Sequence, residues 1–272
     1  MSTYLDHAGT TIPSKSMLLS IFDDILKEPL GNPHSQKSTS CKIDDVRLMI
    51  LDYFGINNDQ YDVIFTSGAT ASCKIVAESI PFNDNGVFAY PSNAHTSLLG
   101  MRGYANNAIC IPFDKLIDYE SIMKESTSTS TSTSTSTSTS TSTSTSTSYY
   151  NLLALSGECN FSGSKLDFNN VFKKANNSLG TDWLTTEFSA KRVKSHNDKE
   201  LRNNDMSWLL FLDAAKLSST SPLNLSLSLP HFVAVSFYKI FGYPTGLGKS
   251  HYNYYYLCYN SINLLISRRF DN

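Results

Sequence analysis

Six short apolar runs, separated by polar or amphipathic segments, constrain the fold of this sequence most. The runs are residues 63–65, 86–89, 108–111, 152–155, 209–212 and 232–235. Apolar residues follow one another in each run with little alternation, which is typical of strands in a sheet covered on both faces. Segments with helical periodicity lie among them, at residues 14–27, 38–54, 69–79 and 96–106. This succession predicts an α/β fold with a mainly parallel sheet and helices on both faces.

Two polar stretches interrupt this pattern. Residues 126–148 are an unbroken alternation of Ser and Thr. Such a segment has no apolar face to bury, so we interpret it as a disordered surface insertion. A second stretch, from about residue 176 to 205, is rich in Asn, Lys, Ser and Thr and is interpreted as another expanded loop. Both insertions fall between apolar runs, where a rigid scaffold tolerates added chain.

One lysine stands where a reactive amine is expected. Lys239 follows the last apolar run and precedes a segment rich in Gly and Pro. Partial burial lowers the pKa of a lysine, and the neutral amine can form a Schiff base with an aldehyde. Asp213 ends the preceding apolar run, and a carboxylate there can keep a pyridinium nitrogen protonated. Lysine and aspartate are the pair that pyridoxal 5'-phosphate chemistry requires, although a lysine taken alone is more simply a surface residue.

A candidate phosphate-binding turn follows the first apolar run. Residues 66–71 read Thr-Ser-Gly-Ala-Thr-Ala and lead into a predicted helix. Gly68 permits close backbone approach, Ser67 and Thr70 offer hydroxyl groups, and Ala69 begins the helix, whose first N–H groups can bind an anion. Taken alone, the segment is more simply an ordinary capped turn between a strand and a helix.

Several motifs in fixed order resemble the amino-terminal part of molybdenum cofactor sulfurases. Besides the turn and the lysine segment, they are Tyr4-Leu-Asp-His-Ala-Gly-Thr-Thr11, Gly31-Asn-Pro-His-Ser-Gln36, Ala94-His-Thr-Ser97 and Asn160-Phe-Ser-Gly163. The resemblance implies the fold of class V aminotransferases, a pyridoxal phosphate-dependent transferase fold shared with cysteine desulfurases. It covers residues 1–248 as one domain with the two insertions. Residues 249–272 match nothing in the family and are left as an unassigned, divergent tail.

The resemblance also implies roles for single residues. His95 would stack on the cofactor ring and move protons, and Asn160 would lie near the cofactor's phenolic oxygen. Ser236 and Tyr238 would reach the phosphate together with residues 67–70, while His7 and Asn32 would line the substrate pocket. For His95 and Asn160, a local capping or turn role is an open alternative. Lys216 departs from the desulfurase pattern, which has Gln or His at this position.

The function implied is sulfur transfer from L-cysteine to the molybdenum cofactor or a molybdoenzyme acceptor. Two alternatives stay open: a cysteine desulfurase that supplies sulfur generally, and a catalytically silent protein. The resemblance ends near Gly248, before the part of the family that carries the sulfur-accepting cysteine and the arginine for the substrate carboxylate. Cys258 is too close to Lys239 to match that cysteine. We therefore expect this chain to be truncated relative to the family and inactive alone. A homodimer is compatible with the resemblance.

Composition excludes several other classes of function. The chain has 272 residues, of which 40% are apolar, enough for a sizeable core. Its net charge of −2 gives no electrostatic footprint for nucleic acid or an anionic membrane. No apolar stretch is long enough to span a bilayer, and no signal peptide pattern opens the chain. Five widely spaced cysteines suggest neither a disulfide framework nor a metal site. A cytoplasmic protein is expected.

Overall fold

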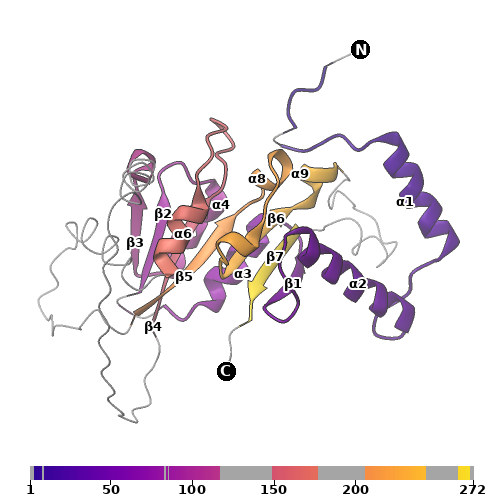
Figure 1. The fold of residues 1–272 in the computed structure, drawn as a ribbon, viewed down its shortest axis with the longest axis horizontal. Helices are drawn as coiled ribbons and strands as arrows, with labels where there is room; N and C mark the ends of the chain where they lie inside the picture. Colours follow the sequence, from indigo (N-terminus) through magenta and orange to yellow (C-terminus); the bar gives the residue numbers. More distant parts are fainter. Residues whose placement is uncertain are drawn as a thin grey trace, which may run out of the picture.

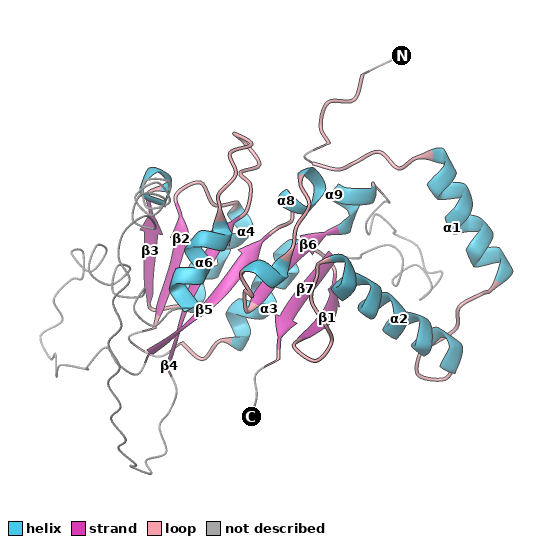
Figure 2. Cartoon of the chain, viewed as in Figure 1, coloured by secondary structure: helices cyan, strands magenta, loops and turns pink. Residues whose placement is uncertain are grey.

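The structure is a computed structural model that describes residues 3–7, 9–82, 84, 86–116, 149–176, 206–242 and 263–269. Along these residues helices and strands alternate (Figure 2). The Ser/Thr stretch at 126–148, and the second polar stretch beyond residue 176, lie outside the described residues. Their predicted disorder therefore stays a prediction.

A seven-stranded mixed sheet forms the centre of the molecule (Figure 1). Its strands are β1 (Tyr61–Thr66), β2 (Val87–Pro91), β3 (Asn107–Ile111), β4 (Tyr149–Ser156), β5 (Met206–Asp213), β6 (Phe232–Ser236) and β7 (Asn263–Arg268). Their order is β1-β7-β6-β5-β4-β2-β3. Only β7 runs against its neighbours, so the other six strands share one direction. The prediction of an α/β fold with a mainly parallel sheet is confirmed.

The helices in the described residues match the four periodic segments of the sequence and include three more, at residues 168–176, 217–220 and 237–241, that were not predicted. They are α1 (Lys15–Lys27), α2 (Lys37–Tyr53), α3 (Ala69–Ser79), α4 (Thr96–Leu99), α6 (Phe168–Asn176), α8 (Leu217–Thr220) and α9 (Phe237–Phe241), with 3₁₀ turns η1 (Gly100–Tyr104) and η4 (Leu225–Leu227). The helix expected over 96–106 is instead split into α4 and η1. Gly100 and Gly103 lie in the second half of that segment, and glycine is a poor residue for a helix interior.

Apolar side chains on both faces of the sheet make two separate cores. One contains residues of α2 and α6, among them Leu51 and Phe172, and the other contains residues of α3, α4 and η1, among them Val76 and Met101. The central strands contribute to both, because successive side chains of a strand point to opposite faces. Helices therefore cover the sheet on both sides (Figure 1). None of the helices in the described part of the chain is long and apolar enough to cross a membrane.

Strand β7 comes from the segment that the sequence left unassigned. It pairs with β1 along residues 61–66 and with β6 along residues 232–236, antiparallel to both. Leu265 and Ile266 are buried and enter opposite cores. Part of the tail is therefore an interior strand of the sheet, and it separates β1 from β6.

Candidate functional site

A pocket opens at the edge of the sheet where the six parallel strands end. Its volume is about 490 Å³, within the range of small-molecule sites. The residues that line it follow β1, β2, β4, β5 and β6, and a segment near the N-terminus closes one side. This is the usual position for a ligand in an open α/β sheet, because loops from several strands converge there.

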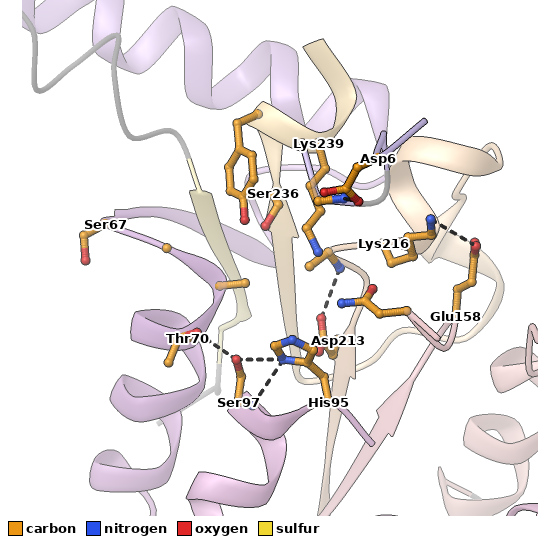
Figure 3. A pocket seen from close by; sticks show the side chains of 16 residues that line it. Asp6, Ser67, Thr70, His95, Ser97, Glu158, Asp213, Lys216, Ser236 and Lys239 are labelled. Carbon is orange, nitrogen blue, oxygen red and sulfur yellow. Dashed lines mark hydrogen bonds and ion pairs between the residues drawn. The ribbon is translucent and has the colours of Figure 1, made fainter. Parts of the chain in front are cut away.

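The lysine and the aspartate singled out from the sequence both line this pocket (Figure 3). Lys239 lies in α9, directly after β6, and is only 8% exposed. Asp213 ends β5 and is also 8% exposed, and its Oδ1 accepts a hydrogen bond of 3.1 Å from the Ala215 N–H. Adjacent parallel strands thus bring together two residues that are far apart in the sequence.

Burial shifts both groups toward their neutral forms. It raises the pKa of Asp213, while the Ala215 N–H and the charges of His95 and Lys239 act in the opposite direction. Burial also lowers the pKa of Lys239, against the attraction of Asp213 and Asp6, and the charge of Lys216 lowers it further. An amine with a lowered pKa is more often unprotonated at neutral pH, which is the form that attacks a carbonyl carbon.

The predicted phosphate turn forms another wall of the pocket. Ser67, Gly68, Ala69 and Thr70 all line it, and α3 begins at Ala69 without a side-chain cap. A side chain at Gly68 would meet nothing within 4 Å, so the space above this turn is open. The first N–H groups of a helix have no partner within the helix. The turn can therefore receive an anionic group.

Ser236 faces the pocket with a hydroxyl group that no other described residue satisfies. The residue is fully buried, and its Oγ has no hydrogen-bond partner among the described residues. A buried polar atom without a partner is costly, and a bound polar ligand would remove that cost. Tyr238 lines the pocket as well.

His95 is held in one tautomer by Ser97. The Ser97 N–H donates to Nδ1 of His95 over 3.2 Å, so this nitrogen carries no proton and the neutral ring has its N–H at Nε2. The Ser97 hydroxyl lies 3.0 Å from the same Nδ1 and 2.7 Å from Oγ1 of Thr70. Ser97 thus links the histidine to the phosphate turn (Figure 3). Ser97 belongs to the motif Ala94–Ser97, but nothing in the sequence selected this residue for the site.

Asn160 also lines the pocket, whereas two residues predicted for the substrate do not. His7 is exposed and packs its ring edge against Tyr4 at a centroid distance of 4.9 Å. Asn32 is exposed in the connection between α1 and α2, where its Oδ1 accepts from the His34 N–H. Their substrate-binding role stays a prediction. In the motif that contains His7, Asp6 and Gly9 line the pocket instead.

Glu158 is a pocket residue that the sequence did not indicate. It follows β4 and its side chain is 5% exposed. Its Oε1 lies 3.9 Å from Nζ of Lys216, and its Oε2 lies 3.6 Å from Nζ of Lys165 and accepts from the Thr220 hydroxyl. A single carboxylate in a loop carries no sequence signal, since only the fold brings these partners to it.

Sequence comparison relates this chain to molybdenum cofactor sulfurases. No family model matches the chain. The chain is 35% identical to the molybdenum cofactor sulfurase of Solanum lycopersicum over 261 residues, which is 91% of this chain and 30% of the relative. It is 36% identical to molybdenum cofactor sulfurase 3 of Aedes aegypti over 245 residues, 90% of this chain and 27% of the relative. The chain is a homologue of molybdenum cofactor sulfurases. It spans about 30% of the length of these curated relatives.

Solved structures show the same fold. A NifS-like protein from Rickettsia africae aligns with 98% of this chain and 58% of its own, at a TM-score of 0.61 and 18% identity. A cystine C–S lyase, solved with its product cysteine persulfide, aligns with 98% of this chain and 57% of its own, at a TM-score of 0.59 and 10% identity. A further structure of that lyase carries a glycine covalently linked to its pyridoxal phosphate cofactor. The chain therefore has the class V pyridoxal phosphate-dependent fold.

Proposed function

We propose that this chain binds pyridoxal 5'-phosphate and takes part in the transfer of sulfur from L-cysteine to the molybdenum cofactor or a molybdoenzyme. The observation that carries this proposal is that buried Lys239 and buried Asp213 line one pocket together with the open start of α3. The identity of 35% with a sulfurase, against 10–18% with the solved desulfurase-fold structures, favours the molybdenum branch over general sulfur supply.

The residues present fit this cofactor. Lys239 would attach it covalently, Asp213 would face its ring nitrogen, and the turn at residues 67–70 with Ser236 and Tyr238 would hold its phosphate. A phosphate group would accept a hydrogen bond from the unsatisfied Oγ of Ser236 and would occupy the open space above Gly68. When bound, the cofactor supplies an electron sink for bonds at the α-carbon of an amino acid.

The chain's own groups supply the rest of the chemistry. Lys239 can give up or take a proton at Nζ, because burial lowers the pKa of the amine. His95 offers a proton at Nε2, since Nδ1 is occupied by the Ser97 N–H. Asp213, shielded from water, keeps its carboxylate oriented through the Ala215 N–H.

The covalent assignment can be tested directly. Adding pyridoxal phosphate to the purified chain is expected to produce a visible absorption band, and borohydride is expected to fix the cofactor's mass to the peptide that contains Lys239. Lys239→Ala should abolish the fixed adduct completely, because the amine is removed while the rest of the pocket stays. Lys165 lies outside the pocket lining, so Lys165→Gln should keep the fixed adduct. An adduct on another lysine, or none in a folded sample, would contradict the proposal.

Turnover by the isolated chain is expected to be absent. Sulfur release from cysteine needs a positioned thiolate, and no cysteine is among the pocket-lining residues in the described ranges. Of the described cysteines, Cys73 and Cys159 are buried and Cys41 and Cys110 are exposed, all of them free. Alanine and sulfide formation from L-cysteine should therefore stay at background. Steady alanine production that Cys258→Ala abolishes would overturn this expectation and would make the tail cysteine a working nucleophile.

A further inference from the structure

The pocket contains a second lysine for which the proposed chemistry has no role. Lys216 comes three residues after Asp213, where the chain leaves β5 and enters α8. Its side chain is 15% exposed and lines the same pocket as Lys239. Cysteine desulfurases are expected to have Gln or His at this position, so the ammonium group is a departure from the desulfurase pattern.

Glu158 holds this ammonium group in the pocket wall. Its carboxylate is almost inaccessible to water, and a buried carboxylate is stable only when charged or polar partners surround it. Lys216 contacts Oε1, while Lys165 and Thr220 contact Oε2 (Figure 3 shows the Lys216 contact). The ammonium of Lys216 thus lies 3.9 Å from one oxygen of a buried carboxylate that lines the same pocket.

Three charged groups act on the Lys239 amine, and they are Asp213, Asp6 and Lys216. Asp213 from β5 and Asp6 from the N-terminal segment favour its protonated form. Lys216 opposes both carboxylates, since like charges repel more strongly where water is scarce. The charge of His95 acts on the pKa of Asp213 and is not among the charges that act on the Lys239 amine. Without Lys216, burial alone would lower the pKa of Lys239 against the two carboxylates, which raise it.

We propose that Lys216, fixed by Glu158, is a positioning residue that keeps the Lys239 amine unprotonated and therefore nucleophilic. It acts through its charge and not through contact with the reacting atoms. The inference rests on the proposed function only in that a carbonyl compound is what the amine would react with. The electrostatic effect on Lys239 exists in the protein without any cofactor, so it can be measured separately.

The test is the pH dependence of acylation of Lys239 by acetic anhydride, followed by mass spectrometry on the cofactor-free chain. Lys216→Gln removes the charge but keeps a hydrogen-bond donor toward Glu158. We expect the labelling profile to move to higher pH, with labelling at neutral pH slower by roughly threefold or more. Lys216→Arg keeps the charge and should restore the original profile.

Lys165→Gln is the matched control. It removes the same charge from the same carboxylate, but Lys165 is 44% exposed and does not line the pocket. Its profile should coincide with that of the unchanged chain. If Lys216→Gln leaves the profile in place, or if Lys165→Gln moves it as far, the proposal is wrong. Thermal unfolding of each variant confirms folding, and Lys216→Met replaces Lys216→Gln if that variant does not fold.

The outcomes separate this inference from the proposed function. A shifted profile in Lys216→Gln supports the role of Lys216 even if pyridoxal phosphate forms no adduct on Lys239. Conversely, an adduct on Lys239 together with unchanged profiles would support cofactor binding and reject the role of Lys216.

Discussion

Replacing Gly242 with alanine is expected to detach the N-terminal segment from the helix that carries Lys239. Gly242 ends α9 with a positive φ of 72°, and a Cβ there would lie 2.2 Å from the carbonyl oxygen of Thr11 and 2.6 Å from the nitrogen of Pro13. Both atoms belong to the backbone, so no side-chain rotation relieves the clash. The Thr11 hydroxyl, which donates to the Lys239 carbonyl over 2.6 Å, would lose its partner.

Gly163→Ala separates this clash from backbone strain. Gly163 has a similar φ of 70°, but a Cβ there meets nothing within 4 Å. Both variants bear the ~1–2 kcal/mol that a side chain costs in the left-handed region. Gly242→Ala should lose a further ~1–3 kcal/mol in unfolding free energy, the usual effect of overpacking, and should weaken the borohydride adduct on Lys239. Equal losses in denaturant titrations of the two variants would show that the N-terminal segment does not pack as described.

Shortening Ile266 to alanine is expected to destabilise the whole sheet. Ile266 is fully buried in the core that also contains Val63 and Val233, its partners on the two strands that flank β7. Such truncations cost about 2–5 kcal/mol because they leave a cavity as well as losing buried surface. Domains of this kind are stable by only about 5–15 kcal/mol, so the melting temperature should fall by many degrees.

Ser267→Ala provides the comparison within the same strand. Ser267 is half-buried, and the change removes a single hydroxyl group, for which a change within ~0.5 kcal/mol is expected. Denaturant midpoints measured side by side decide the question. If Ile266→Ala is as mild as Ser267→Ala, β7 is not an interior strand of the sheet in solution.

Much of the fold could be predicted because its signals are local. All six predicted apolar runs are strands, and the helix predicted over residues 69–79 begins and ends as expected. A parallel strand covered on both faces must be apolar throughout. An apolar run such as Leu152–Leu155 therefore predicts a strand without knowledge of the strands that pair with it. The expected positions of Lys239 and Asp213, each at the end of such a run, follow from the same rule.

Other features depended on contacts between distant residues. The segment that forms β7 contains only a short apolar run, which alone fits a strand, a helix or a loop, and its place between β1 and β6 is set by pairing on both sides. His7 and Asn32 belong to two of the family motifs, yet neither side chain lines the pocket. A motif does not specify which of its side chains point into the pocket.

The sequence by itself determined the class of fold, the direction of most strands and the ends at which reactive groups would gather. Only the tertiary structure decided which groups share one pocket: Glu158 beside Lys216, Ser97 between His95 and Thr70, and Asp6 near Lys239. The physical reason is range. Burial and periodicity act along neighbouring residues, whereas a charge or hydrogen bond acts over a few ångströms of space, which the chain can only provide once it has folded.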